Sequence, residues 1–361
     1  MMGMDCQLQS ERNKDFILRF HKKLFTDRVP VSGSMELTTR CNFNCVHCYL
    51  PESERKGKGQ GQELTTKAVL KLIDDMADAG CLNLLFTGGE PLLRNDFSEI
   101  YSHSKKKGMI VTVFTNGSTV NDEHIRLFRD LPPFSIEISV YGSSPQTYEK
   151  ITGVPGSYHH AMAGIDRLHQ NGVRIALKTM LMDLNLHELS TMENMARQLG
   201  VKFRFDAGIT PRLDGDMTPL LRRVPPEDVV ALEFQDPKHV QDWKDFWQEQ
   251  NNKESNERLF VCGAGQTSFH ITSTGRLQAC IITPNSSCDI NNGNFLNGWN
   301  EEMIKIRDFK ISKEKTCRNC DLISLCGYCP PVFKLETGSQ DSCSEFLCRL
   351  GHLRHKMIIN L

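Results

Sequence analysis

Three cysteines fall within eight positions near the start of the chain. They are Cys41, Cys45 and Cys48, spaced C-x3-C-x2-C, and Tyr49 follows the last of them. A structural zinc ion normally has four protein ligands, so this loop is one ligand short. A 4Fe–4S cluster held by three thiolates keeps one iron free to chelate a small molecule. The missing fourth ligand can therefore be the functional feature of the loop, and the alternatives are a catalytic zinc ion or His47 as a fourth ligand.

A second concentration of cysteines lies between positions 262 and 348. Eight of them read Cys262-x12-Gly275-x4-Cys280, then Cys317-x2-Cys320-x5-Cys326-x2-Cys329, then Cys343-x4-Cys348. Such clustering favours metal ligation over scattered core thiols, although the C-x2-C pairs also suit zinc ribbons. Cys6, Cys81 and Cys288 fit neither pattern. We expect Cys81 to be a buried structural thiol at a strand start, and Cys288 is an outside candidate for a ligand.

The composition is that of an ordinary globular protein. Of 361 residues, 39% are hydrophobic and 24% are charged, and the net charge is -1. This balance gives no electrostatic footprint for nucleic acid or an anionic membrane. The N-terminus does not resemble a signal peptide, and no apolar run approaches the roughly 20 residues of a membrane helix. We therefore expect a cytoplasmic protein with reduced cysteines and with neither a nucleic-acid nor a membrane partner.

Strand-like and helix-like stretches alternate from about residue 34 to residue 210. The expected strands are Met35–Thr39, Leu82–Thr87, Met109–Thr115, Phe134–Tyr141, Val173–Met180 and Val201–Asp206. A helix is expected over Thr65–Ala79, where apolar residues recur at i, i+3, i+4 and i+7. Thr65 or Thr66 can cap its start, and Gly80 can stop it. Strands that alternate with helices predict a parallel α/β sheet.

The expected strands carry polar side chains on one face. In Phe134–Tyr141, apolar residues alternate with Ser135, Glu137 and Ser139. A closed eight-stranded barrel fills its interior with branched apolar side chains, so the polar face predicts a wider, incomplete barrel around a wet cavity. Chemistry should lie at the C-terminal ends of the strands. The polar residues expected at those ends are Thr87, Thr115, Ser139, Lys178 and Asp206.

Changes in composition divide the chain into four parts. Residues 1–33 form an N-terminal extension and 34–215 the barrel. Residues 216–258 form a polar, partly helical linker, and 259–361 form a small cysteine-rich domain.

The first cysteine loop resembles the signature of the radical SAM superfamily, in which an aromatic residue usually follows C-x3-C-x2-C. Two stretches at strand ends support the resemblance. TGGEP at Thr87–Pro91 looks like the family's GGEP element, and SVYG at Ser139–Gly142 is similar to its ribose-contacting S-x-x-G region. The segment YEKITGVPGSYHHAMAGIDRL also resembles many members. The resemblance covers about residues 34–215 and implies a partial (β/α)6 TIM-like barrel.

The resemblance also implies cofactors and the residues that hold them. Cys41, Cys45 and Cys48 would bind a 4Fe–4S cluster whose free iron chelates S-adenosylmethionine (SAM). Reduction by a donor such as ferredoxin or flavodoxin would split SAM into methionine and a 5′-deoxyadenosyl radical, which takes hydrogen from a C–H bond. The residues expected around SAM are Tyr49, Thr87, Gly88, Gly89, Glu90, Pro91, Asn116, Ser139 and Lys178. The alternatives are a solvated turn carboxylate for Glu90 and a satisfied polar lining for Ser139 and Lys178.

The C-terminal cysteines resemble the SPASM domain of radical SAM enzymes, which holds two auxiliary 4Fe–4S clusters. The distal cluster would be held by Cys317, Cys320, Cys326 and Cys348, because Cys348 fits the last position better than Cys343. The proximal cluster would be held by Cys262, Cys280 and Cys329, and it is either completed by Cys343 or left with an open iron. Two departures from the family pattern matter. Only two residues separate Cys326 from Cys329, where three are common, and no fourth cysteine lies between Cys262 and Gly275.

Enzymes with a SPASM domain mostly modify peptides or proteins, which implies maturation of a ribosomally made peptide by crosslinking, epimerisation or backbone modification. The rival functions are formylglycine formation in a sulfatase, with Asp206 as a base, and tetrapyrrole or cofactor biosynthesis. A multi-cluster electron carrier and a zinc-stabilised binding module are the alternatives without catalysis. Some 33 residues precede the first strand, too few for a leader-recognition domain. We therefore expect a separate partner protein or a groove to present the peptide.

Overall fold

The computed structural model describes residues 13–59, 61–251, 260–283, 287–291, 294–307, 317 and 320–360. Its elements are α1 (Asn13–Thr26), β1 (Ser32–Thr38), α2 (Glu52–Arg55), α3 (Thr66–Asp78), β2 (Asn83–Gly88), η1 (Pro91–Leu93), α4 (Phe97–Lys106), β3 (Ile110–Thr115), α5 (Asp122–Asp130), β4 (Ser135–Ser139), α6 (Pro145–Thr152), α7 (Ser157–Gln170), β5 (Ile175–Met180), η2 (Leu186–Glu188), α8 (Leu189–Gln198), β6 (Lys202–Asp206), η3 (Thr218–Arg222), α9 (Pro226–Glu233), α10 (Pro237–Asn251), β7 (Ser268–Ile271), β8 (Arg276–Gln278), β9 (Ser287–Asp289), α11 (Phe295–Asn297), η4 (Gly298–Glu302), α12 (Met303–Arg307), α13 (Pro330–Thr337) and α14 (Glu345–Ile359). Among the described residues, no helix has both the length and the apolar character that a membrane span requires.

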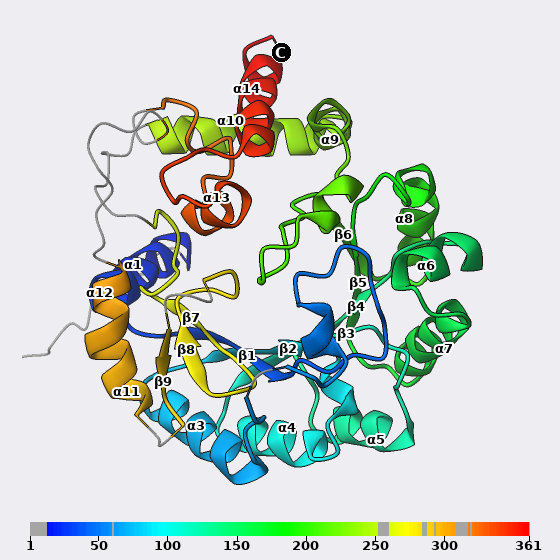
Figure 1. The fold of residues 1–361 in the computed structure, drawn as a ribbon, viewed down its shortest axis with the longest axis vertical. Coiled ribbons are helices and arrows are strands. Elements are labelled where there is room, and N and C mark those ends of the chain that lie inside the picture. Colours follow the sequence, from blue (N-terminus) through cyan, green and yellow to red (C-terminus); the bar gives the residue numbers. More distant parts are fainter. Residues whose placement is uncertain are drawn as a thin grey trace, which may run out of the picture.

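The strands in these ranges form one nine-stranded sheet in the order β6-β5-β4-β3-β2-β1-β7-β8-β9. Strands β1 to β6 are parallel, and each pairs with the next one along the chain. Their bounds differ from those of the predicted strands by no more than three residues at either end. Figure 1 shows these strands as an arc, with helices α3 to α8 on its outer side. The predicted partial (β/α)6 barrel is therefore confirmed.

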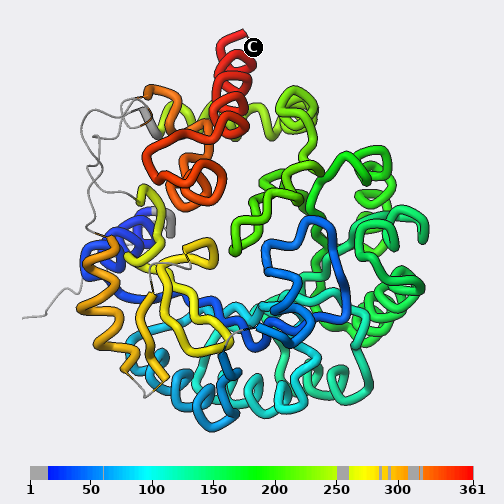
Figure 2. The backbone as a smooth tube through the Cα atoms, viewed as in Figure 1, coloured from blue at the N-terminus to red at the C-terminus, as the bar shows by residue number. Residues whose placement is uncertain are grey.

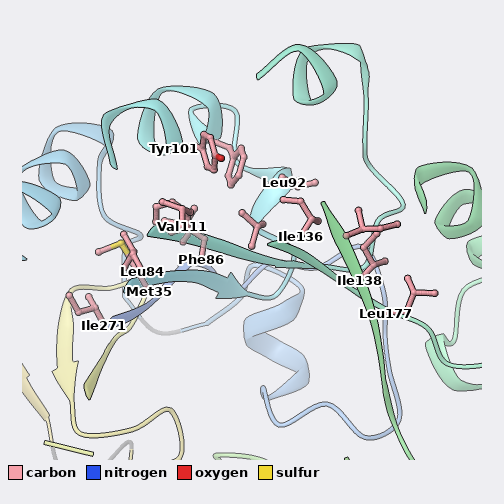
Figure 3. Packing of buried hydrophobic residues seen from close by; sticks show 14 of the residues in the cluster. Met35, Leu84, Phe86, Leu92, Tyr101, Val111, Ile136, Ile138, Leu177 and Ile271 are labelled. Atoms are coloured by element: carbon pink, nitrogen blue, oxygen red, sulfur yellow. The ribbon is translucent and has the colours of Figure 1, made fainter. Parts of the chain in front are cut away.

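The helix-facing side of the sheet is the hydrophobic core (Figure 3). Met35, Phe86, Val111, Ile138 and Leu177 come from five neighbouring strands, and each is at most 1% exposed. Burial of such side chains is the main favourable contribution to folding.

Helix α3 shows how local sequence positions one layer of this core. The Thr65 side chain accepts a hydrogen bond from the Ala68 backbone N–H at 3.3 Å, as expected for an N-cap. Gly80 takes a φ of +95°, which ends the helix at low steric cost. The predicted apolar stripe, which comprises Val69, Leu72, Ile73 and Met76, is buried.

The opposite face of the sheet points into the arc and is polar. Side chains alternate between the two faces of a strand, so Glu36 on β1, Glu137 on β4, Lys178 on β5 and Arg204 on β6 share this inner face. Within the described ranges the sheet ends at β6 and β9 instead of closing on itself. The polar face thus borders an open interior, as the strand pattern predicts.

The cysteine-rich segment is continuous with the barrel. Strand β7 pairs in parallel with β1, and β8 and β9 follow in antiparallel pairing. The predicted linker, residues 216–258, contains α9 and α10, which lie beside α14 (Figure 1). Arg354 on α14 donates hydrogen bonds to both carboxylate oxygens of Glu233 on α9, at 2.8 and 2.7 Å. The domain bounds stay predictions. The sheet crosses the bound predicted at residue 259, because β1 lies before that residue, β7 lies after it, and the two strands pair.

Candidate active site

The cysteine loop follows β1 and folds into the opening of the arc, beside the segment after β6 (Figure 2). Neighbouring segments hold its backbone. Cys41 N–H donates to the Arg55 carbonyl at 3.1 Å, Asn44 N–H to the Thr152 carbonyl at 2.7 Å, and Val46 N–H to the Ile151 carbonyl at 3.0 Å. These bonds order an irregular loop without a helix or strand of its own.

The three thiols of the loop lie close enough to affect one another. The pKa of Cys41 is raised to about 12, chiefly by burial and also by the nearby Glu90 and Cys48. Arg55, 4% exposed, opposes this rise in the pKa of all three thiols. It also donates to Asn44 Oδ1 at 2.8 Å. Three thiolates with one buried cation are a donor set that fits a 4Fe–4S cluster. Sequence analysis missed Arg55, because nothing in PESERKGKG distinguishes it from a surface residue.

A cavity of about 390 Å³ opens beside the loop, and we call it the active-site cavity. The predicted residues that line it are Cys41, Cys45, Cys48, Tyr49, Thr87, Gly88, Gly89, Asn116, Ser139, Lys178 and Asp206. The C-terminal ends of the parallel strands therefore converge as the barrel predicts. Ile281 and Ile282, which follow Cys280, close the cavity from the C-terminal segment. Glu90 and Pro91 are buried next to it.

The two glycines of the TGGEP stretch are required by close backbone approach. Gly88 has a φ of +130°, and a Cβ there would overlap the carbonyl oxygen of Thr38. A Cβ on Gly89 would overlap the carbonyl oxygens of Thr39 and Arg40. Gly89 N–H donates to the Thr38 carbonyl at 2.8 Å, and Glu90 N–H to the Arg40 carbonyl at 2.9 Å. The end of β2 is thereby joined to the cysteine loop.

Glu90 holds strand ends together and is fully buried. Its carboxylate accepts hydrogen bonds from Leu92 N–H at 3.1 Å, Thr115 Oγ1 at 2.8 Å and Asn116 N–H at 2.7 Å. Burial nevertheless raises the pKa of Glu90 to about 7, although these hydrogen bonds lower it. The solvated turn carboxylate considered for Glu90 is therefore wrong. Its three hydrogen-bond partners are all groups of the protein.

Lys178 and Ser139 reach the cavity from neighbouring positions of β5 and β4. The Lys178 ammonium nitrogen lies over the Phe114 ring and 3.8 Å from Glu137 Oε2. Arg204 donates to the same carboxylate oxygen at 2.6 Å. Burial lowers the pKa of Lys178 well below its usual value, and Glu137 opposes this shift. Lys178 thus has a protein partner while it lines the cavity.

Tyr49, Asp206 and His47 complete the cavity wall. The Tyr49 hydroxyl donates to Glu36 Oε1 at 2.9 Å, which fixes its ring. Asp206 is exposed at the end of β6, and its carboxylate accepts from Gly208 N–H at 2.7 Å in a tight turn. The His47 ring packs against Tyr141, with 4.8 Å between the ring centroids.

The C-terminal cysteines form two groups. Cys317, Cys320, Cys326, Cys343 and Cys348 line one small cavity. The second group consists of Cys262, Cys280 and Cys329. The pKa of Cys329 is raised to about 11, chiefly by burial and also by the neighbouring Cys280 and Cys262. The structure therefore places Cys343 with the distal thiols, and three thiols remain at the proximal position within the described ranges.

Two further cysteines lie apart from these groups, and Cys6 lies outside the described residues. Cys81 is 5% exposed at the start of β2, with its sulfur 3.5 Å from the Asn83 carbonyl oxygen. It is the buried thiol that sequence analysis expects. Cys288 lies on β9 so close to η4 that a Cβ on Gly298 would be 3.0 Å from its sulfur.

Comparison with known proteins agrees with this site. Residues 35–198 match the family model of the radical SAM superfamily. The chain is 27% identical over 318 residues to an AdoMet-dependent heme synthase of Methanosarcina barkeri, which covers 81% of this chain and 89% of that protein. It is 25% identical to the sporulation killing factor maturation protein SkfB of Bacillus subtilis, over 70% of this chain and 60% of that protein. Three further curated relatives are matched over less than half of their own length.

Among solved structures, Streptococcus suis SuiB bound to its precursor peptide SuiA has a TM-score of 0.70. The match covers 96% of this chain and 84% of SuiB at 15% identity, so it shows a shared fold. The matched residues of the family model run from β1 to the end of α8 and contain the cysteine loop and the glycine turn. Residues 35–198 therefore form a radical SAM domain, and the proteins of this superfamily that resemble the chain are enzymes.

Proposed function

We propose that this radical SAM enzyme is a post-translational maturase that removes hydrogen from a ribosomally made peptide and thereby crosslinks, epimerises or otherwise modifies it. Family membership implies a 4Fe–4S cluster and SAM as its cofactors. Two of the similar proteins have peptide chemistry in their names: SkfB matures a sporulation killing factor, and SuiB was solved with a precursor peptide. The sheet does not close on itself within the described residues, so its inner face is open on one side.

In this proposal each residue of the active-site cavity has a defined task. Cys41, Cys45 and Cys48 hold the cluster, which when bound supplies the electron that splits SAM into methionine and a 5′-deoxyadenosyl radical. Gly88 and Gly89 bring bare backbone to the methionine part of SAM. Tyr49, held by Glu36, lies against the adenine. The remaining contacts to SAM come from Thr87, Asn116, Ser139 and Lys178, while the buried Glu90 and Pro91 support the turn.

The observation that carries the proposal is the wall shared by the two halves of the chain. Ile281 and Ile282 line the active-site cavity, and they directly follow Cys280 of the proximal thiol group. We assign Cys262, Cys280 and Cys329 to one auxiliary cluster, and the five-thiol cavity to the other. An auxiliary cluster at the proximal position would supply an electron acceptor beside the substrate, which oxidative crosslinking of a peptide needs.

The test is an anaerobic assay with the fully reconstituted chain, dithionite, SAM and each short peptide encoded beside its gene. We expect 5′-deoxyadenosine, methionine and a peptide that has changed in mass or stereochemistry. A crosslink lowers the peptide mass by about 2 Da, since two hydrogen atoms leave. Formation of 5′-deoxyadenosine without any altered peptide would contradict the peptide proposal and leave the radical SAM activity intact.

A second candidate function is the modification of a tetrapyrrole. It is favoured by the similarity to a heme synthase along 81% of this chain. It is also favoured by Arg204, a partly exposed cation that lines the active-site cavity and could pair with a carboxylate of such a substrate. The same assay with iron coproporphyrin separates the functions, because loss of carbon dioxide from that substrate would establish tetrapyrrole chemistry.

A further inference from the structure

A second cavity, of about 570 Å³, lies behind the wall that Tyr49 forms. Glu36, Glu54, Asp214, His270 and Gln278 define it, and we call it the anchor cavity. Ile281 lines both this cavity and the active-site cavity. The two are also joined by the hydrogen bond from Tyr49 to Glu36, because Tyr49 lines the first and Glu36 the second. The anchor cavity therefore lies directly beside the site of SAM chemistry.

A polar row across three strands forms part of the anchor cavity wall. Ser34 on β1 lies opposite His270 on β7, which lies opposite Gln278 on β8. His270 Nδ1 is 2.8 Å from Ser34 Oγ, so one ring nitrogen is satisfied. Gln278 is only 4% exposed, and no other described residue forms a hydrogen bond with its side-chain amide. Its side chain lines the cavity, so a ligand with backbone-like donors and acceptors can bond to this amide.

The charges that face the cavity favour a cation. The charged and titratable lining residues are Glu36, Arg40, Glu54, Glu63, Asp214, His270 and Arg276. Arg40 and Glu63 pair with each other through two hydrogen bonds of 3.2 Å. Arg276 donates to Ser287 Oγ at 2.7 Å. In the described part of the chain Glu54 has no Lys or Arg partner, and the His270 ring lies beside Glu36, with Nε2 3.8 Å from Glu36 Oε1. Burial raises the pKa of Glu54, and Glu36 and Asp214 raise it further, so this part of the cavity has a negative potential.

We propose that the anchor cavity binds a lysine or arginine residue of the peptide substrate. Glu54 and Glu36 pair with the side-chain cation, and the Gln278 amide bonds the peptide backbone. This inference rests on the proposed function, because it names the substrate residue that positions the reacting residue in the neighbouring cavity. Since the cavities share Ile281, the anchor residue lies only a short distance along the peptide from the residue that loses hydrogen.

The test measures binding without turnover, on the reconstituted full chain with SAM bound. The probes are N-acetyl-arginine N-methylamide and its neutral analogue N-acetyl-citrulline N-methylamide, titrated by ligand-observed NMR. We expect the arginine probe to bind about tenfold more tightly. Glu54→Gln should remove this preference, whereas Glu52→Gln, two positions away on the exposed side of α2, should keep it. Gln278→Met should weaken both probes alike, because it removes the amide that bonds the backbone of either probe, and the melting temperature of the variant checks that the fold is kept.

Several results would overturn the inference. Equal binding of the two probes, or an unchanged preference in Glu54→Gln, would show that the cavity does not recognise a cation. Spermidine that binds as tightly as the arginine probe and displaces it would assign the cavity to free polyamines. If a peptide is modified equally well after its lysines and arginines are replaced, the anchor cavity does not bind such a residue. The proposed function would still hold. If the arginine probe binds but no peptide is modified, the proposed function fails while the cation site remains.

Discussion

The two cysteine-rich regions of the molecule gather their thiols in different ways. Cys41, Cys45 and Cys48 come from one loop, which backbone hydrogen bonds to residues 55, 151 and 152 hold in place. The C-terminal groups instead draw on separate segments. Cys280 follows β8, Cys329 is the N-cap of α13, and the distal group combines residues 317–326 with residues 343–348.

This difference shows where the ordering of each metal site comes from. A short loop closes at small entropic cost, and its thiols stay together even when distant parts of the chain move. The C-terminal groups lie where distant segments meet, because β7 pairs with β1 and α14 packs against α9. Gly351 on α14 illustrates the closeness of that packing, because a Cβ there would be 2.8 Å from the Cys326 Cβ. Damage to the C-terminal packing should therefore affect the N-terminal thiol site less than damage to the barrel affects the C-terminal thiol groups.

The largest effect should come from the N-terminal loop. Cys41→Ala removes one of three cluster ligands, and we expect formation of 5′-deoxyadenosine to fall by more than about a hundredfold. Cys81→Ala is the control, because Cys81 is a buried thiol that lies outside every thiol group. Anaerobic product analysis, with iron and sulfide content, checks both variants. Equal activity of Cys41→Ala and Cys81→Ala would show that the cysteine loop has no catalytic role.

A smaller effect should follow when the support of that loop is altered. The Cβ of Gly89→Ala would overlap two carbonyl oxygens at the end of β1, so we expect the free energy of unfolding to fall by about 2–3 kcal/mol. SAM affinity should fall with it, because the turn and the cysteine loop share hydrogen bonds. Denaturant titration and SAM binding under anaerobic conditions measure both quantities.

The control for this change separates overlap from backbone strain. Gly108 has a φ of +81°, and no atom lies within 4 Å of the point that a Cβ would occupy. Gly108→Ala should therefore cost only about 1 kcal/mol and leave SAM binding unchanged. If the two variants are equally destabilised, close approach is not what requires glycine at position 89.

The same contrast explains how much the sequence could predict. The six strands, the capped helix at Thr65 and the N-terminal cysteines were predictable, because each depends on residues that are close together in the chain. The inward polar face of β4 to β6 was predictable for the same reason, since it follows from alternation. The wet, open barrel could therefore be anticipated without any knowledge of distant contacts.

The features that sequence analysis missed all depend on which distant segments meet. Arg55 becomes a buried neighbour of the thiols only when α2 folds back over the loop. Strand β7 has four residues, too few for a distinct pattern, and its place beside β1 creates the anchor cavity. The position of Cys343 among the distal thiols depends on how the start of α14 packs. The hydrogen bonds that Glu90 accepts from Thr115 and Asn116 likewise depend on β3 and on the turn after it.

Glu90 also provides a pH test of the N-terminal region. Because its pKa rises from the usual 4.5 to about 7 in the folded protein, its favourable contribution is complete below pH 4.5 and is lost as the pH rises through 7. The free energy of unfolding of the wild type, relative to Glu90→Gln, should therefore fall by about 2 kcal/mol between pH 5 and pH 8. Denaturant titrations of both proteins across this range measure the difference. A constant difference would mean that the three hydrogen bonds keep Glu90 ionised throughout.

The smallest effect should come from Cys343, and it tests the assembled region directly. Five thiols line the distal cavity, whereas a 4Fe–4S cluster takes four, so Cys343→Ser should keep its full iron and sulfide content. Cys343→Ser combined with Cys348→Ser leaves three thiols and one iron without a protein ligand, and we expect this double variant to lose iron to a chelator faster than either single variant. Cys288→Ser is the control, since Cys288 packs under η4 instead. Loss of iron from Cys343→Ser alone would mean that Cys343 is an obligatory ligand. Cys343 would then be a candidate ligand of the proximal cluster. To reach that cluster it would need α14 to pack differently from the way described above.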